Sequence, residues 1–201
     1  SKVFPQSSSL EYMKGVEFSH EKYGNVIITR TGYTGEIGFE ISINSAQASN
    51  LWNELLSNDL VRPIGLGARD SLRLEVGYPL YGNDLNTSTD PISAGISWVI
   101  SKNHTDFIGF EKLPKESDTK RLGILLEDRG VLRSGYDVFD LNGHKISTLT
   151  SGGYSPILEK SIGQAYLPTK YQIGETVFVE IRGKKIKAIV SSIAFVTTNP
   201  K

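Results

Sequence analysis

The sequence contains no cysteine, and its three histidines, His20, His104 and His144, lie far apart along the chain. The absence of thiols excludes disulfide bonds, a cysteine nucleophile and every cysteine-based metal site. The scattered histidines do not have the spacing of metal ligands. We therefore predict that the chain has no metal site and no chemistry that depends on a thiol.

An excess of charge of one sign is also lacking, since 22 basic residues balance 22 acidic ones. With no net positive charge, the protein has no overall electrostatic attraction for nucleic acid or an anionic membrane, so we expect neither as a partner. No apolar run reaches the roughly 18 to 20 residues of a membrane span, and no signal peptide is apparent. We expect a cytoplasmic bacterial protein or a protein of the mitochondrial matrix.

The first part of the sequence predicts two strands and a helix. Residues 26–29 are mostly apolar and β-branched, and residues 39–43 alternate apolar with polar side chains, which predicts strands joined by a glycine-rich connection. In the second strand Glu40 lies on the face opposite Phe39 and Ile41. A helix is predicted from 46 to about 57, with Ser45 as its cap.

Two short elements are predicted before residue 114. Ile96, Trp98 and Ile100 alternate along their segment, which predicts a strand from 91 to 100, and a short helix is predicted from 107 to 113. Trp98 is by default a core aromatic residue, although a tryptophan beside a cleft can stack on a flat heterocycle.

The polar run from 114 to 119 predicts a domain boundary, after which the pattern changes to short strands separated by turns. Six strands without a helix indicate a small antiparallel barrel or sandwich. They are predicted at 121–126, 137–141, 145–150, 162–167, 177–181 and 185–195. Asn142-Gly143 and Arg182-Gly183 are typical hairpin turns, and Gly152-Gly153 is interpreted as a tight connection.

The stretch from Pro63 to Leu85 carries an unusual density of charge. A helix is predicted from Leu66 to Val76, and on it Arg69 and Arg73 lie four residues apart as like charges. Asp70 has the spacing to reach Arg73, so Arg69 is left to seek another partner or a ligand. Gly77 and Pro79 then end the helix.

Four motifs occur in order along the chain. They are Arg30-Thr31-Gly32-Tyr33-Thr34-Gly35-Glu36 with Gly38-Phe39-Glu40-Ile41, then Gly67-Ala68-Arg69-Asp70-Ser71-Leu72-Arg73-Leu74-Glu75, then Leu80-Tyr81-Gly82-Asn83-Asp84, and finally Thr150-Ser151-Gly152-Gly153-Tyr154-Ser155-Pro156. Together they resemble the aminomethyltransferase (T-protein) family of the glycine cleavage system, part of the folate-binding T-protein superfamily. The resemblance covers the chain nearly end to end.

The resemblance implies an α+β chain, with part of an α/β folate-binding domain at 1–113 and a small all-β antiparallel barrel at 120–201. It implies transfer of the one-carbon unit from the aminomethyl-lipoyl group of the partner H-protein to tetrahydrofolate, with release of ammonia. Glu40 is the expected pterin-binding carboxylate and Arg69 its companion. Tyr78 and Trp98 match aromatic positions near the folate.

The chain also departs from the family pattern. The family's catalytic aspartate lies in an amino-terminal half that is not present in this sequence, so no catalytic residue is assigned. The chain begins with Ser1 rather than methionine, and we expect it to be the carboxyl-terminal part of a longer protein, with little or no catalysis by itself. The carboxyl end also lacks a further ligand-contacting residue that the family carries.

Two other functions are considered. The first is a different folate-dependent demethylase of the same superfamily, which acts on a small methylated substrate. The second is a non-catalytic folate-binding module, such as an iron–sulfur assembly factor or the folate domain of a larger dehydrogenase. Assembly factors carry a Lys-Gly-Cys signature, which a chain without cysteine cannot have.

Overall fold

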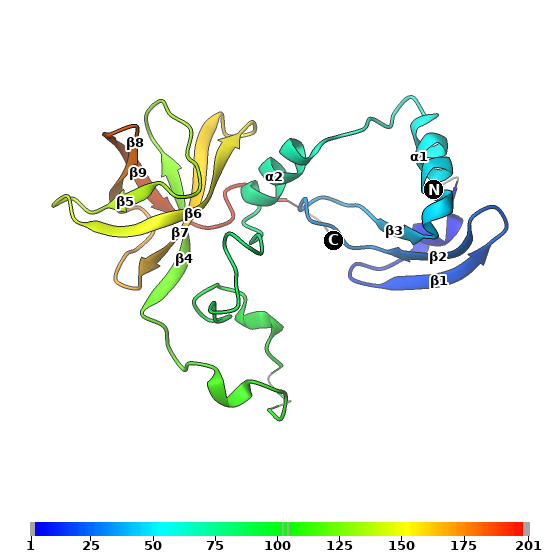
Figure 1. Cartoon of the computed structure of the whole chain (residues 1–201), viewed down its shortest axis with the longest axis horizontal. Coiled ribbons are helices and arrows are strands. Elements are labelled where there is room, and N and C mark those ends of the chain that lie inside the picture. Colours follow the sequence, from blue (N-terminus) through cyan, green and yellow to red (C-terminus); the bar gives the residue numbers. More distant parts are fainter. Residues whose placement is uncertain (1–2, 102, 104, 199–201) are drawn as a thin grey trace. The chain divides into compact units, whose positions relative to one another are not determined.

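The computed structural model describes residues 3–101, 103 and 105–198, which form two compact units. The first unit runs to Leu72 and includes Thr198, and the second is Arg73–Thr197. Figure 1 follows the chain through both units. The predicted domain ranges, 1–113 and 120–201, remain predictions. Among the described residues, no helix combines the length and the apolar character needed to cross a membrane.

The first unit is built on a three-stranded antiparallel sheet in the order β1 (Gly15–His20), β2 (Gly24–Thr29) and β3 (Glu40–Ile43). β2 and β3 confirm the two predicted strands, whereas β1 was not predicted. The register places the apolar residues of the three strands on one face of the sheet, except Ile27, which lies on the opposite face. The buried residues of this core are Phe4, Tyr23, Val26, Ile28 and Leu51.

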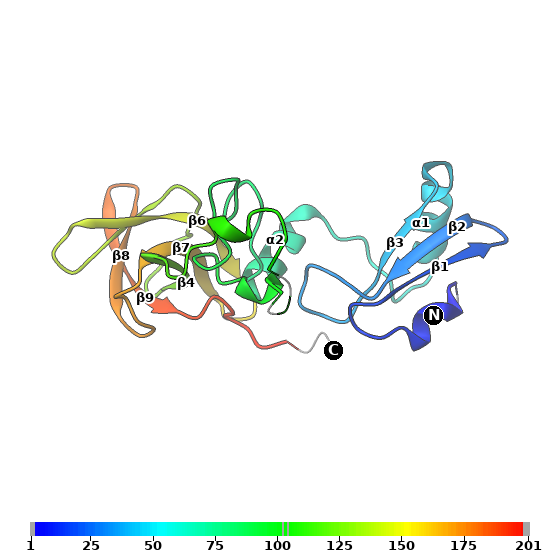
Figure 2. The same ribbon diagram turned by 90° about the horizontal axis from the view of Figure 1, so that it is seen from below.

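Helix α1 (Ala48–Leu56) lies beside the three-stranded sheet (Figure 2), and its residues Leu51 and Leu55 belong to or pack against this core. It follows a short 3-10 helix, η2 (Ser45–Gln47), so the predicted helix is confirmed in most of its length. The predicted cap is wrong. The side chain of Asn44, not Ser45, accepts the hydrogen bond from the Ala46 amide at 2.9 Å, because the helical turn begins one residue earlier.

The chain before β1 closes the other side of the core. The 3-10 helix η1 (Pro5–Ser9) follows Phe4, whose side chain is only 2% exposed. The Phe4 ring meets the ring of Phe18 edge-on, with the centroids 6.1 Å apart. This segment is therefore part of the hydrophobic core and not only a connection.

The charged helix is observed as α2 (Leu66–Glu75), and Gly77 follows it with a φ of +79°, as its role in ending the helix requires.

The predicted strand from 91 to 100 is wrong. Its residues form turns and the 3-10 helix η3 (Ser97–Val99), because the Asp90 carboxylate accepts the amides of Ile92 and Ser93 at 2.9 Å each. These local bonds compete with strand pairing.

The second unit contains the predicted barrel, and all six strands are confirmed. The short helix predicted before them is reduced to the 3-10 helix η4 (Phe110–Lys112). The antiparallel sheet closes in the order β4-β7-β6-β5-β8-β9, with β9 paired back to β4 (Figure 1). The strands are β4 (Thr119–Leu126), β5 (Asp137–Phe139), β6 (Lys145–Ser155), β7 (Lys160–Pro168), β8 (Thr176–Ile181) and β9 (Lys184–Ser191).

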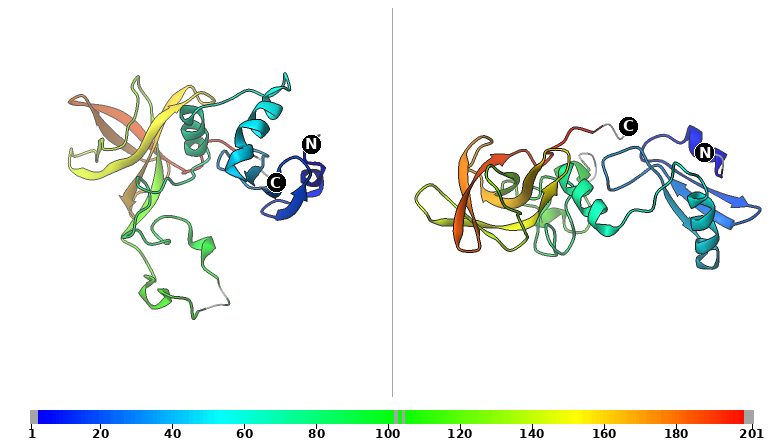
Figure 3. Two further views of the ribbon diagram at one scale, coloured as in Figure 1. Left: turned by 45° about the vertical axis from the view of Figure 1, so that its right-hand side comes forward. Right: turned by 90° about the horizontal axis from the view of Figure 1, so that it is seen from above.

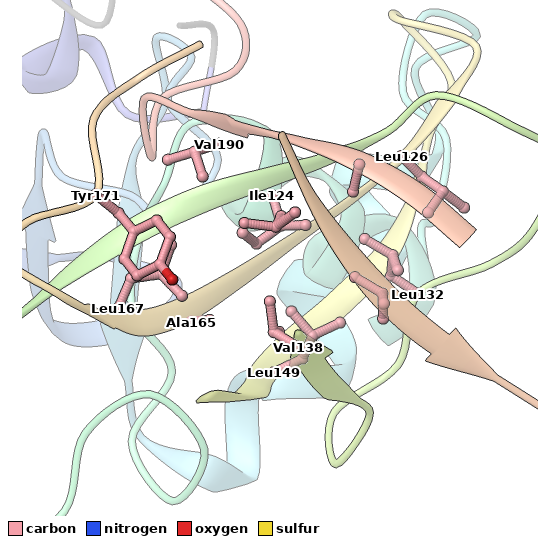
Figure 4. Packing of buried hydrophobic residues seen from close by; sticks show 12 residues of the cluster. Ile124, Leu126, Leu132, Val138, Leu149, Ala165, Leu167, Tyr171 and Val190 are labelled. Atoms are coloured by element: carbon pink, nitrogen blue, oxygen red, sulfur yellow. The ribbon is translucent and has the colours of Figure 1, made fainter. Parts of the chain in front are cut away.

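The barrel interior is filled by side chains from all six strands, as Figure 4 shows. One prediction about it is wrong: Gly152 and Gly153 do not form a tight connection but continue β6. A Cβ atom on Gly152 would lie 2.7 Å from the main-chain carbon of Leu132 and from the Arg133 nitrogen. The glycine therefore permits close backbone packing and not a turn.

A buried ion pair fastens the segment after α2 to the barrel. Arg73 is 2% exposed and donates to the Asp84 carboxylate at 2.9 Å, and to the Ser151 hydroxyl of β6 at 2.9 Å. Asp84 also accepts from Ser151 at 2.8 Å and from the Leu80 amide at 2.8 Å. The carboxylate partner of Arg73 is thus Asp84, while the pairing with Asp70 stays a prediction.

A second buried arginine makes similar contacts from β4. Arg121 donates to the carbonyl oxygens of Ala94 at 2.9 Å and of Gly77 at 3.0 Å, and to the Gln164 side chain at 2.6 Å. These acceptors belong to two loops and to β7. The loops of this unit are therefore held on the barrel by charge-assisted hydrogen bonds.

We predict that Asp84→Ala lowers the free energy of unfolding by about 3 to 5 kcal/mol, because it leaves the Arg73 charge buried without a partner. Urea denaturation followed by circular dichroism measures the loss. Asp59→Ala, at an exposed aspartate, is the control and should have almost no effect. A loss for Asp84→Ala below about 1 kcal/mol would place the pair in the class of exposed ion pairs.

Burial raises the pKa of Tyr166 to about 12, against an opposing effect of Arg121. Its hydroxyl donates to the Asp84 main-chain oxygen at 2.7 Å. In the unfolded chain the hydroxyl of this tyrosine ionises at a pH of about 10. The folded chain keeps it neutral to higher pH, so the stability that this group contributes is complete below a pH of about 10 and is lost as the pH rises through about 12. We predict that Tyr166→Phe removes this loss. Urea midpoints at pH of about 9 and about 11 should differ more in the parent chain than in the variant.

Candidate functional site

A pocket of about 480 Å³ lies within the first unit. It is formed by the long connection between β2 and β3, visible in Figure 3, together with the start of α2. Its volume is within the range of small-molecule sites. The lining residues are Thr31, Gly32, Tyr33, Thr34, Gly38, Phe39, Glu40, Ile64, Gly65, Leu66 and Arg69.

Glu40 is the first residue of β3, and its side chain is exposed in this pocket. It pairs with Thr29 of β2. Strand alternation directs Glu40 away from the face that Ile41 adds to the core. The Thr31 hydroxyl donates to the Glu40 carboxylate, and the Thr29 and Thr31 hydroxyl oxygens lie 2.7 Å apart. Two threonines thus orient a carboxylate that still has acceptor capacity for a ligand.

Arg69 lies on α2, and its guanidinium carbon is 4.5 Å from the centre of the Tyr33 ring. This distance is a cation–π contact. Arg69 was expected to seek a partner other than Asp70 or a ligand, and the Tyr33 ring is one such partner. Stacking uses the face of the guanidinium and leaves its in-plane N–H groups directed outward. Within the described residues, no side chain accepts a hydrogen bond from these groups.

Glycines open the pocket between these two side chains. A Cβ atom built on Gly32 or on Gly65 would meet no protein atom within 4 Å. Protein packing therefore does not require glycine at either position. The missing side chains leave the main chain of the pocket accessible to a ligand.

Tyr78 and Trp98 belong to the second unit. The Tyr78 amide donates to the Arg73 carbonyl at 2.8 Å, which closes the turn after α2. Trp98 lies in η3, and 77% of its side chain is exposed, so it is not the core residue that the alternating pattern predicted. Their expected place beside the folate stays a prediction.

The pocket combines a carboxylate acceptor, a guanidinium donor and an aromatic ring around open backbone. Such groups recognise a flat polar molecule that has neighbouring N–H donors and a carbonyl or carboxylate. The lining contains no amine, imidazole or thiol. In the part of the chain that the structure describes, no cluster of three or more potential metal ligands occurs. The side chains that the pocket offers to a ligand are therefore a carboxylate, a guanidinium, hydroxyl groups and aromatic rings.

Sequence reasoning predicted Glu40 and Arg69, which line the same pocket, as ligand-binding residues, but it assigned no role to Thr31 or Tyr33. Both lie in the motif that carried the resemblance, so their positions were in view. The missing information was which side chain each one contacts. A hydrogen bond to Glu40 and a stack on Arg69 depend on how the β2–β3 connection folds, which residue spacing does not reveal.

The fold is mixed α/β with a closed antiparallel barrel, and the first unit holds an open pocket lined by Glu40 and Arg69. Two family models match it, described as "GCVT N-terminal domain" over residues 2–104 and "Glycine cleavage T-protein C-terminal barrel domain" over residues 120–196. The chain therefore belongs to the glycine cleavage T-protein family. The recognition made from the four motifs is confirmed, as is the predicted fold class.

Individual relatives agree with the family models. The chain is 45% identical over 184 residues to the aminomethyltransferase of Staphylococcus saprophyticus, covering 89% of this chain and 50% of the relative. It is 43% identical over 183 residues to that of Bacteroides fragilis, with 87% and 50% covered. The chain thus spans about half the length of the aminomethyltransferases it matches.

A solved structure extends the similarity to three dimensions. The crystal structure of the glycine cleavage system aminomethyltransferase T from Bartonella henselae matches with a TM-score of 0.87 and 39% sequence identity. The match covers 94% of this chain and 54% of that chain.

Proposed function

We propose that this chain supplies the folate-binding wall of an aminomethyltransferase. The reaction passes the one-carbon unit of the aminomethyl-lipoyl group on H-protein to tetrahydrofolate and releases ammonia. The observation that carries the proposal is the placement of Glu40 and Arg69 in one open pocket of a chain whose relatives are aminomethyltransferases.

The pocket chemistry suits a pterin ring. The Glu40 carboxylate can accept two hydrogen bonds from the adjacent amino and ring N–H groups of a pterin. Its hydrogen bond from Thr31 restricts rotation, so less entropy is lost when the ligand binds. Arg69, held against Tyr33, offers planar donors to a carbonyl or carboxylate of the same ligand.

The contribution of these residues to the reaction is positioning. A transfer between two bound partners is accelerated when the accepting amine is held in attack geometry. The transfer also needs a group that moves a proton, and a chain that spans about half the length of its aminomethyltransferase relatives need not carry every such group. We therefore infer that the chain by itself binds tetrahydrofolate but does not release ammonia from aminomethylated H-protein.

We predict that Glu40→Ala weakens the binding of tetrahydrofolate by about 1 to 3 kcal/mol, because a charged hydrogen-bond acceptor is lost. Titration calorimetry with the chain measures this change. Glu36→Ala is the matched control, since Glu36 is an exposed glutamate of the same connection that does not line the pocket. Equal affinity of parent and Glu40→Ala would refute the assignment of the site.

We predict a similar loss for Arg69→Lys, about 1 to 3 kcal/mol, because an ammonium group cannot both stack on Tyr33 and present planar donors. The same titration measures it, and the exposed Arg62 provides the control Arg62→Lys. Unchanged affinity together with a lowered melting temperature would make Arg69 a structural residue only.

A further inference from the structure

A second pocket, of about 590 Å³, lies at one end of the barrel and shares no lining residue with the first pocket. It is formed by the loop between β4 and β5 and by the β8–β9 hairpin, both visible in Figure 1. Its volume falls within the range of small-molecule sites.

The charge of this pocket is entirely positive. Four cationic side chains line it, and none of its lining residues is acidic. The whole chain has equal numbers of basic and acidic residues, so composition does not account for this segregation. The cations are Arg129, Arg133, Arg182 and Lys184.

These cations also lack the partners that neighbouring lysines have. Lys187 on the same hairpin pairs with Glu127 at 2.7 Å, and Lys185 donates to the Gly143 carbonyl at 3.2 Å. Among the described residues, none of the four pocket cations makes an ion pair or a side-chain hydrogen bond. A bound anion would be attracted by all four cations and would reduce their mutual repulsion.

The hairpin turn between β8 and β9 places Arg182 at this pocket. Arg182 adopts a φ of +52° and Gly183 a φ of +77°, as the two central residues of such a turn require. Glycine, asparagine and aspartate are the residues usually found at such left-handed positions, so asparagine can replace Arg182 without loss of the turn.

The remaining lining is apolar. Tyr136, Ile181 and Ile186 are half-buried, and Val131 is 41% exposed. Gly130 fits closely here, since a Cβ atom on it would lie 2.9 Å from a methyl carbon of Leu126. The pocket therefore offers apolar surface next to its cations. Arginine guanidinium groups bind phosphate with paired hydrogen bonds, which makes phosphate the fitting anion.

We propose that the barrel end binds a small molecule that carries two or more phosphate groups on a flat or apolar group, as nucleoside di- and triphosphates do. The phosphates contact the four cations, and the flat group lies against Tyr136 and the aliphatic side chains. This site is independent of the proposed folate pocket, because no residue lines both.

The test titrates ATP and pyrophosphate into the full chain in a calorimeter. We expect saturable binding of ATP with one site, tighter than that of pyrophosphate and weakened by added salt. The variant Arg133→Gln with Arg182→Asn should bind ATP at least about tenfold more weakly, because charged hydrogen bonds are lost. Asparagine tolerates the left-handed turn, so the hairpin is retained.

Lys160→Gln is the matched control, because it removes an exposed cation that does not line the pocket. It should bind ATP normally, as should Glu40→Ala, which separates this result from the folate proposal.

No saturable binding at millimolar ATP overturns the proposal, as does an equal loss in Lys160→Gln. Pyrophosphate binding as tight as ATP refutes the role of the apolar surface. Binding of poly-glutamate without binding of ATP assigns the pocket to an acidic protein partner instead.

Discussion

The buried ion pair between Arg73 and Asp84 is the interaction on which the arrangement of the second unit depends. Both side chains are almost fully removed from water, and the carboxylate accepts from the backbone of its own loop and from a serine of β6. A buried charge is costly unless all its hydrogen bonds are made. The residues after α2 therefore have one position on the barrel in which Arg73 and Asp84 are both satisfied. Arg121 repeats this arrangement through the carbonyl of Gly77.

Much of the fold could be predicted from residue patterns, because the barrel strands alternate and end at turn-forming residues. The failures have two physical causes. The segment around Trp98 forms no strand, because the Asp90 carboxylate accepts the Ile92 amide and caps the turn that begins at Asp90. A pair of glycines suggests a turn, but Gly152 is glycine because the backbone of Leu132 passes too close for a side chain. The first outcome depends on a local hydrogen bond and the second on a tertiary neighbour, and alternation along the chain specifies neither.

In the candidate site, too, the sequence indicates which residues to consider, whereas the structure shows what they contact. Glu40 and Arg69 could be selected from the sequence because their motifs are specific to the family and a strand carboxylate beside glycines is unusual. That Thr31 orients the carboxylate and Tyr33 supports the guanidinium depends on the folded loop. The cationic pocket could not be predicted from the sequence. Arg129 and Arg182 are distant in sequence and meet only because β4 and β8 belong to one closed sheet.

Barrel closure through β4 and β9 has a consequence for the order of folding. β4 is the first barrel strand to be synthesised, and the partner on one of its edges is the last. Until β9 has left the ribosome, the backbone groups on that edge have no strand to bind, and such an edge can pair with another chain. Hydrogen bonds between strands so far apart in sequence also form slowly. Protection of the nascent chain against aggregation is thus needed for longest at β4.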